Sequence, residues 1–294
     1  MKKVECFVIG VQKGGTTSLY NLLKRFSNIV VSSKKETKFF FNDYLYEKGE
    51  SYYQSCFDSR GEGIFVDVDP EYSLGVTAIE RILKYNKDAR FVFLLREPVS
   101  RAYSHYLMSV RRGIEERSFE EAFFSSIHDS PLNNIDVDKG YFQRGKYELF
   151  LRELYARVDS KNVCLSVYEE FVASEDERRR VLKFIGVSDG EIHKADDLPR
   201  ANVAKASKIR ILSYILHHHN WIKNEKARRL ISYLKMRLPY VGQVYGKLRD
   251  FNMTEADKKE LSADLRKEMS AYYVSDVDYL VELGCFGVKR FWGA

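Results

Sequence analysis

Short apolar runs alternate along the chain with stretches of helical spacing. The apolar runs lie at residues 4–10, 28–33, 63–70, 89–95 and 162–168. The run at 89–95, ARFVFLL, has five consecutive apolar residues, as expected for a parallel strand that is covered on both faces. Strand–helix alternation of this kind predicts an α/β fold with a central parallel sheet and helices on both faces.

Three of the helical stretches are placed by their ends. Residues 16–26, TTSLYNLLKRF, have helical spacing and follow the loop that ends the first apolar run. Residues 118–123 and 174–186 both begin with a Ser-x-x-Glu capping box, and the second stretch closes at Gly186. Because no internal repeat, low-complexity tract or interdomain linker interrupts the pattern, residues 1–294 are predicted to form a single domain.

The composition is that of a globular protein with a substantial core. The chain has 294 residues, of which 45% are hydrophobic and 14% aromatic. The aromatic content suits either sugar stacking or core packing. No stretch approaches the roughly 18 apolar residues that span a bilayer. The N-terminus runs straight into a strand-like segment, so no signal peptide is expected.

The cysteines are scattered and form no C-x-x-C pair. They are Cys6, Cys56, Cys164 and Cys285. This spacing favours buried, reduced thiols in a cytoplasmic protein, and it gives no reason to expect a metal site. The three histidines at 217–219 do not change this expectation, because consecutive residues spread around a helix and no acidic partners lie nearby in the sequence.

Positive charge is concentrated in one segment. Residues 204–249 carry eleven Lys and Arg residues and one acid, a net charge of +10, in a chain whose total is +6. Apolar residues at helical spacing accompany the charges, so a basic helical insertion is predicted over 204–250. It is either a solvated helix face or a surface for an anionic cofactor, a polyanionic glycan or a membrane lipid, with possible peripheral membrane contact and no nucleic-acid partner expected.

The sequence FVIGVQKGGTTSLYNLLKRF looks like a phosphate-binding loop between a strand and a helix. Gly10, Gly15 and Thr17 fit the spacing G-x-x-x-x-G-K-[ST]. Thr16 stands where the lysine is usual, and a lysine occurs three residues earlier, at Lys13. The alternative is an ordinary glycine-rich turn.

The loop is expected to bind a phosphate through backbone N–H groups and the positive end of the helix dipole. The expected binding residues are Gly14, Gly15, Thr16, Thr17 and Ser18. Lys13, on the turn, is expected to reach the oxygen that bridges a 5′-phosphate and a group being transferred from it. Thr17 would contact the phosphate with no metal implied.

A second motif, FVFLLREPVSRAYSHY, begins with the most apolar strand. Arg96 stands at the carboxyl end of that strand, where α/β sheets bind ligands, and Pro98 opens the following helix. Ser104 lies about two turns into the helix. An arginine and a serine hydroxyl at this edge suit a second phosphate. The alternative is that Arg96 pairs with a local acid such as Glu97.

Together the two motifs resemble those of sulfotransferases that depend on 3′-phosphoadenosine 5′-phosphosulfate (PAPS). QKGGTTSL is similar to their 5′-phosphosulfate loop, and REPVSRAYS to their 3′-phosphate motif. The resemblance is closest to glycan sulfotransferases of the heparan sulfate type and to bacterial carbohydrate sulfotransferases. KETKFF at 35–40 matches a K-E-x-x-F-F stretch of the former, and SDVDYLVELGCFGVKRFW resembles the end of bacterial members.

The resemblance implies a three-layer P-loop-like fold in which the basic helices are inserted before a C-terminal helical element. It implies transfer of a sulfuryl group from PAPS to a hydroxyl or amine of a carbohydrate or glycolipid acceptor. The product of the donor would be 3′-phosphoadenosine 5′-phosphate (PAP), and no metal would be needed. Lys13 would stabilise the leaving phosphate, and Tyr168, in the YEE segment, would contact adenine.

Glu36 would take the proton from the acceptor. Its alternative role is that of a surface glutamate beside Lys35 and Lys38. Asp67 and Asp69, at the end of the strand-like run 63–70, are the alternative bases.

Two features depart from the resemblance. A lysine that the glycan enzymes commonly carry in the strand matching VDVDPEY is Val68 here. The Arg-Lys-Gly cap on the 3′-phosphate of the small-molecule enzymes is also absent, and its candidate substitutes are Lys205, Lys208 and Arg210.

Two other functions fit parts of the sequence. The segment IFVD, ending at Asp67, matches the Walker B magnesium ligand of an NTP-dependent kinase, although Thr16 in place of the lysine argues against it. A non-catalytic polyanion-binding module would rest on residues 204–249. A magnesium requirement distinguishes the kinase, and a lack of stabilisation by nucleotide distinguishes the binding module.

Overall fold

A five-stranded parallel sheet forms the centre of the computed structural model. The structure describes residues 2–58, 62–128, 136–195, 205–207, 253–255 and 261–293. The strands lie in the order β2-β3-β1-β4-β5, and every neighbouring pair is parallel, which confirms the predicted sheet type. Their bounds are β1 (Cys6–Gly10), β2 (Ile29–Val31), β3 (Ile64–Val68), β4 (Arg90–Leu95) and β5 (Val163–Val167).

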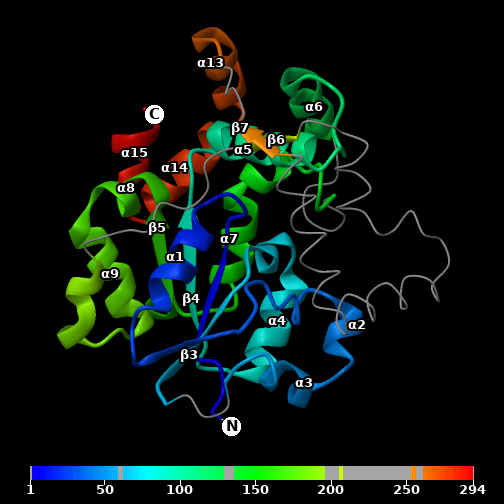
Figure 1. The fold of residues 1–294 in the computed structure, drawn as a ribbon. Coiled ribbons are helices and arrows are strands. Elements are labelled where there is room, and N and C mark those ends of the chain that lie inside the picture. Colours follow the sequence, from blue (N-terminus) through cyan, green and yellow to red (C-terminus); the bar gives the residue numbers. More distant parts are fainter. Residues whose placement is uncertain are drawn as a thin grey trace, which may run out of the picture.

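Helices connect the strands and cover both faces of the sheet (Figure 1). As far as β5, the α-helices are α1 (Thr16–Leu23), α2 (Asp43–Tyr46), α3 (Glu50–Gln54), α4 (Val76–Tyr85), α5 (Pro98–Arg111), α6 (Phe119–Ser125) and α7 (Tyr147–Tyr155). After β5 come α8 (Tyr168–Ala173), α9 (Glu175–Ile185), α13 (Ala263–Ala271), α14 (Val274–Glu282) and α15 (Gly287–Trp292). The short 3₁₀ helices are η1 (Pro70–Leu74), η2 (Ser126–His128), η3 (Gln143–Gly145), η4 (Ser160–Asn162) and η5 (Asp189–Ala195).

Side chains alternate between the two faces of the sheet and build a core on each. On β1, Phe7 and Ile9 face an apolar cluster that α4 and α7 cover, whereas Cys6 and Val8 face a second cluster that α1 and α9 cover. All four side chains are fully buried. Coverage of both faces explains why the strands are apolar throughout, and it gives the three layers that Figure 1 shows.

The two predicted capping boxes differ in the structure. At α6, the Ser118 hydroxyl accepts from the N–H of Glu121, and the Glu121 carboxylate accepts from the N–H of Ser118, so the box is complete. At α9, Ser174 accepts from the N–H of Glu177, but the Glu177 carboxylate bonds the hydroxyl of Ser166 on β5 instead. At α9, a tertiary hydrogen bond to Ser166 has therefore replaced the bond that the Glu177 carboxylate would make to the N–H of Ser174 in a complete capping box.

Most of the large aromatic side chains that the structure describes lie in the core. Phe39 and Tyr53 stack with ring centroids 4.7 Å apart, and Phe40 meets Tyr53 edge to face at 4.8 Å. Both interactions lie in the cluster under α4. The aromatic richness of the chain therefore reflects packing at these positions rather than a sugar-binding surface.

All four cysteines are free thiols. Cys6 and Cys164 are buried, as predicted, whereas Cys56 and Cys285 are half-buried. Burial raises the pKa of the Cys6 thiol to about 12, which leaves it unreactive at neutral pH. In the part of the chain that the structure describes, no helix combines the length and apolar character needed to cross a bilayer.

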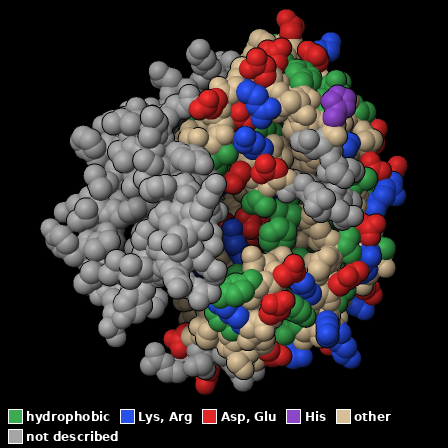
Figure 2. All heavy atoms as spheres, turned by 90° about the vertical axis from the view of Figure 1, so that its right-hand side faces the viewer, with side chains coloured by type: hydrophobic (Ala, Val, Ile, Leu, Met, Phe, Trp, Pro, Cys, Tyr) green, Lys and Arg blue, Asp and Glu red, His purple; other side chains and the backbone are tan. Residues whose placement is uncertain are grey.

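The basic insertion predicted over 204–250 lies outside the described residues except at 205–207. These three residues form β6 (Lys205–Ser207), which pairs antiparallel with β7 (Met253–Glu255). The helical prediction is wrong at these positions, because the pairing partner is distant in sequence and leaves no local signal. On the described face in Figure 2, Lys and Arg side chains are interspersed with Asp and Glu.

Candidate active site

A cavity of about 510 Å³ lies at the carboxyl edge of the sheet, where β1, β3 and β4 end. This edge is where open α/β sheets bind ligands. Its walls include Glu36 and most of the predicted donor-site residues. These are Lys13, Gly15, Thr16, Thr17, Ser18, Arg96, Ser104 and Tyr168. The structure thus brings residues from four separate segments of the sequence to one cavity.

Two glycines shape the loop between β1 and α1. A Cβ atom on Gly14 would lie 2.7 Å from the carbonyl oxygen of Leu94, so only glycine fits against β4 there. Gly15 is the N-cap of α1 and has a left-handed backbone, with φ of 86°. A Cβ atom on Gly15 would also lie 2.3 Å from the ring of Tyr168. Glycine is therefore required at both positions, for different reasons.

The loop offers fewer N–H donors than the five predicted. The N–H of Gly14 donates to the carbonyl of Val11 at 2.8 Å, and that of Ser18 is also used within the loop. Gly14 therefore fixes the shape of the loop rather than binding through its N–H. Within the described ranges, the N–H groups of residues 15–17 have no acceptor. These three N–H groups lie at the positive end of the α1 dipole, where they can bind a phosphate. The loop therefore offers a phosphate three N–H groups, at residues 15–17, instead of the predicted five at residues 14–18.

Lys13 combines a left-handed backbone with an electropositive surrounding. Its φ is 71°, and its carbonyl accepts from Nη1 of Arg96 at 2.9 Å. Burial, together with Arg111, Arg96, Arg112 and nearby Lys35, lowers the pKa of Lys13 to about 8. An anion in the cavity would stabilise the charged form of this lysine and raise that pKa again.

Arg96 is held by the loop rather than by an acid. Its guanidinium lies 5.4 Å from the ring centroid of Tyr168, and its Nε is buried without a hydrogen-bond partner among the described residues. Pairing with Glu97, the alternative considered above, does not occur. The Glu97 carboxylate caps α5 and pairs with Arg266 at 2.8 Å. Arg96 thus keeps a buried donor beside the loop.

Helix α5 and its C-cap supply one predicted residue and two that the predictions had missed. Ser104 lines the cavity, and so do Arg111 and Arg112, seven and eight residues further on. This spacing places all three on one side of the helix, so helical periodicity was the signal that could have found the arginines. Arg112 pairs with Asp138 at 3.2 Å. Arg101, in contrast, is fully buried and bonds the carbonyl of Tyr141.

Glu36 lines the cavity and is ionised. Its carboxylate lies 2.6 Å from Nζ of Lys35, and 36% of its side chain is exposed. Burial favours a higher pKa for Glu36, but the charges of Lys35, Lys38 and Arg112 outweigh it, so the pKa lies below its usual value. Glu36 is therefore a half-buried carboxylate paired with Lys35, not a free surface glutamate. An ionised carboxylate is the form that accepts a proton.

The two alternative bases lie outside the cavity wall. Asp67 is fully buried, and its Oδ2 accepts hydrogen bonds from three hydroxyl groups. Asp69 is also fully buried and accepts from the N–H groups of Lys38 and Glu71. These bonds give both carboxylates structural partners. All three bonds to Asp67 end on Oδ2, whereas its Oδ1 is buried without a hydrogen-bond partner among the described residues and lies away from the cavity wall.

The proposed replacements for the missing 3′-phosphate cap are only partly placed. Lys208 and Arg210 lie outside the described residues. Lys205 begins β6, whose backbone lies against α5, the helix that carries Ser104. Val68, at the position of the missing lysine, is fully buried in the cluster under α1 and α9.

The C-terminal segment that resembles bacterial members braces the wall that holds Arg96. The indole Nε1 of Trp292 donates to Glu169 at 3.0 Å, and the other oxygen of Glu169 accepts from the N–H of Glu97 at 3.3 Å. The hydroxyl of Tyr147 donates to the carbonyl of Arg96 at 2.7 Å. Trp292 also packs against Tyr147, with ring centroids 6.2 Å apart, so it contacts the partners of both the carbonyl of Arg96 and the N–H of Glu97.

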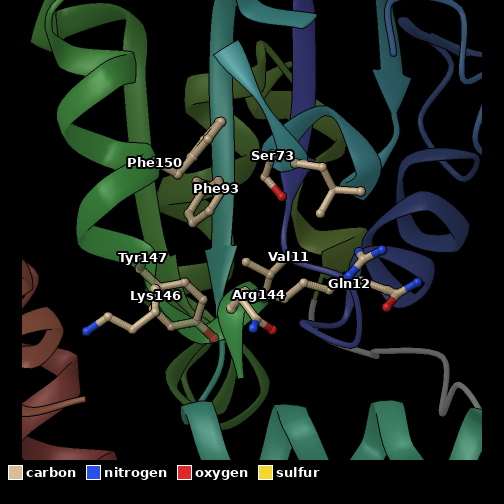
Figure 3. Close-up of a pocket in the computed structure, with 10 residues that line it drawn as sticks. Val11, Gln12, Ser73, Phe93, Arg144, Lys146, Tyr147 and Phe150 are labelled. Carbon is tan, nitrogen blue, oxygen red and sulfur yellow. The ribbon is translucent and has the colours of Figure 1, made fainter. Parts of the chain in front are cut away.

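A second, much smaller pocket of about 20 Å³ lies behind the loop (Figure 3). Gln12 lines both this pocket and the main cavity. Oε1 of Gln12 and Nε of Arg144 are buried without partners among the described residues. In Figure 3 the side chain of Lys146 points away from the centre of the pocket, and it bonds Asp276. The pocket has room for about one water molecule, so the larger cavity is the candidate substrate site.

Comparison with known proteins identifies the family of the chain. A model of the sulfotransferase domain matches residues 3–232. Heparan sulfate glucosamine 3-O-sulfotransferase 5 of Mus musculus is 32% identical over 138 residues, 47% of this chain and 39% of that protein. The 3A1 form of Mus musculus is 30% identical over 186 residues, 62% of this chain and 46% of that protein. The matched region thus spans less than half the length of these relatives.

A crystal structure shares the fold over nearly the whole chain. The sulfotransferase from Alicyclobacillus acidocaldarius aligns with a TM-score of 0.63 at 21% identity, covering 96% of both chains. The family match therefore rests on sequence over residues 3–232, and the shared architecture agrees with it. The chain belongs to the sulfotransferase domain family.

Proposed function

We propose that this protein transfers a sulfuryl group from PAPS to a hydroxyl or amine of a carbohydrate or glycolipid acceptor. One observation carries the proposal: a single cavity combines the free N–H groups of residues 15–17, Lys13, Arg96 and the carboxylate of Glu36. The relatives named above act, by their names, on glucosamine of heparan sulfate, which supports a sugar acceptor.

The residues present fit a donor with two phosphate groups. The N–H groups of residues 15–17 are suited to a 5′-phosphate. Arg96, with its unpartnered Nε, and Ser104 on α5 are suited to a 3′-phosphate. Tyr168 packs against Gly15 and lies under Arg96, so its ring forms part of the same wall, where it would contact the adenine of the donor. No metal is needed to hold either phosphate in this arrangement.

The chemistry needs in-line geometry and stabilisation of the leaving phosphate. Sulfuryl transfer resembles phosphoryl transfer, in which charge grows on the leaving oxygen as its bond breaks. Lys13, on the turn before α1, would donate a hydrogen bond from its charged Nζ to that oxygen. The acceptor oxygen or nitrogen forms a bond to sulfur as the bond between sulfur and the phosphate oxygen breaks. The acceptor proton passes to the carboxylate of Glu36.

The reaction class can be tested with a panel of candidate acceptors. The protein is incubated with labelled PAPS and neutral, acidic and lipid-linked glycans, and the products are identified by mass spectrometry. A mass gain of one sulfuryl group on a glycan, lost in Lys13→Ala and kept in the surface variant Glu120→Gln, is expected. Transfer of phosphate from ATP with magnesium, and none from PAPS, would support the kinase alternative instead.

The basic segment 204–249 supplies a second part of the proposal. Its net charge of +10 suits an anionic acceptor or an anionic membrane surface. Reversing the charges of Arg228, Arg229 and Lys235 is expected to weaken binding of sulfated glycans or of vesicles containing phosphatidylserine, most strongly at low salt. Unchanged binding to both at all salt concentrations would leave the segment as a solvated face.

Two further predictions remain with this proposal. Residues 1–294 are proposed to act as a single domain, which cooperative unfolding with one transition would support. The cytoplasmic location, based on the scattered thiols, is tested by fractionation of cells that express the tagged protein.

A further inference from the structure

Of the four residues in the segment 35–38, Lys35, Glu36 and Lys38 line the cavity, and Thr37 does not. Glu36 and Lys38 both line the cavity, and both have left-handed backbones, with φ of 65° and 57°. Thr37, between them, is buried and faces the sheet. Residues other than glycine rarely adopt this conformation, and they keep it only where several contacts enforce it.

A buried carboxylate provides those contacts. Oδ2 of Asp67 accepts from the hydroxyls of Thr37, Tyr53 and Tyr72, each at 2.9 Å. The three donors come from the segment 35–38, from α3 and from η1, so one oxygen joins three elements at the end of β3. Asp67 is fully buried and does not line the cavity.

Two backbone contacts complete the anchor on either side of Thr37. The N–H of Lys38 donates to Oδ2 of Asp69 at 2.6 Å, and the N–H of Glu36 donates to the carbonyl of Val68 at 3.2 Å. Both partners lie at the end of β3 or directly after it. The peptide groups around Thr37 are thereby fixed to the sheet, and the direction of the Glu36 side chain follows from them.

We propose that Thr37 and Asp67 are positioning residues that hold Glu36 at the reacting centre. The inference rests on the proposed function, in which Glu36 accepts the acceptor proton. The left-handed backbone then has a structural role, because it allows Thr37 to lie in the core while Glu36 lines the cavity beside Lys35. Removing the Thr37 hydroxyl releases the segment while leaving the loop and Arg96 untouched.

The variant Thr37→Val removes the hydroxyl and keeps the volume of the side chain. Its kcat is expected to fall about 10- to 100-fold, the scale of a misplaced catalytic group. The rise in melting temperature caused by PAP should stay as in the unaltered protein, because PAP contacts the other wall. Thr37→Ser should restore most of the turnover, because it returns the hydroxyl. If Thr37→Val does not fold, Thr37→Ala removes the same hydroxyl without placing a methyl group on Asp67.

A double-variant cycle separates positioning from a general structural effect. In a Glu36→Gln background, Thr37→Val should lower kcat no further, since there is no base left to position. A further loss of about tenfold in that background would show that Thr37 acts independently of Glu36, and would overturn the inference. The acidic limb of the kcat–pH profile should also move to higher pH in Thr37→Val, because Glu36 leaves the field of Lys35 and Lys38.

The inference and the proposed function fail in distinguishable ways. If the unaltered protein transfers no sulfuryl group to any acceptor in the panel, the proposed function fails. If Glu36→Gln lowers turnover but Thr37→Val and Asp67→Asn leave kcat unchanged, Glu36 is the base and only the positioning role is wrong.

Discussion

The two walls of the cavity are built by different means. The wall proposed to bind the donor, called the donor wall below, comprises residues 11–18 with Arg96 and Tyr168 and is shaped by glycines and by backbone hydrogen bonds such as that from Gly14 to Val11. The wall proposed to carry the base, called the base wall below, comprises residues 35–38, has no glycine and is held by side chains at and just after the end of β3. Left-handed residues occur on both walls: on the donor wall they lie in a glycine-rich loop, whereas on the base wall they flank Thr37, which bonds Asp67 on β3.

The charges on the two walls also differ. On the donor wall, Lys13 faces other cations, and its pKa falls to about 8. On the base wall and its neighbours, cations have carboxylate partners: Lys35 with Glu36, Lys38 with Glu71 and Arg112 with Asp138. The donor wall is therefore prepared for an anion, whereas the opposite wall is nearly balanced without one. Apart from changes at Lys13, which is also proposed to stabilise the leaving phosphate, changes on the donor wall should affect nucleotide affinity, and changes on the base wall should affect turnover.

The largest effect is expected on the base wall. Glu36→Gln should lower kcat by about 10²–10⁴-fold, because a positioned general base contributes on that scale. The affinity for PAP should change less than about twofold. The comparison is made by steady-state kinetics and by calorimetric titration with PAP, with Glu120→Gln as the surface control. A fall of less than about threefold in kcat would assign the base to another group.

On the donor wall, Arg96→Ala should have the opposite signature. Loss of a charge-assisted hydrogen bond costs about 1.5–3 kcal/mol, or roughly 10- to 150-fold in the Kd for PAP. The matched control is Arg152→Ala, an arginine of α7 that pairs with Glu148 at the surface. An unchanged Kd for PAP in Arg96→Ala would remove Arg96 from the nucleotide site.

The titration of Lys13 gives a smaller, pH-dependent effect on the same wall. Below pH of about 8 Lys13 is charged in the free protein, and above it the lysine loses its proton. Because bound PAP favours the charged lysine, binding above that pH takes up a proton, and affinity should fall by up to about tenfold per pH unit. Calorimetry between pH 7 and 9.5 measures this slope. Lys13→Ala should bind more weakly at neutral pH and lack the dependence.

The smallest effect tests the brace behind the donor wall. Trp292→Phe removes the indole N–H that bonds Glu169 but keeps an aromatic ring next to Tyr147. One hydrogen bond contributes about 1 kcal/mol, so the Kd for PAP should rise no more than about fivefold while kcat at saturation stays constant. Phe286→Tyr, at an exposed position of the same segment, is the control. A drop in kcat without a change in Kd would place the effect on the other wall.

The difference between local motifs on the donor wall and long-range contacts on the base wall explains which features could be predicted from the sequence. The parallel sheet followed from apolar runs, and the donor wall followed from glycine spacing and from Arg96 at a strand end, because both signals are local. The anchor of Glu36 was not predictable, since Thr37 and Asp67 are thirty residues apart and an acid after IFV also suits a magnesium ligand. Strand β6 was missed for the same reason, because its partner β7 is distant in sequence.

The identity of the donor can be tested directly by ligand-dependent thermal unfolding. At about 100 times its Kd, PAP without metal should stabilise the protein by about 2.7 kcal/mol, which raises the melting temperature by roughly 5–10 °C. ATP with magnesium should raise it less, because it lacks the 3′-phosphate that Arg96 and Ser104 are proposed to hold. A larger rise with ATP and magnesium than with PAP would contradict the sulfotransferase function and favour a kinase.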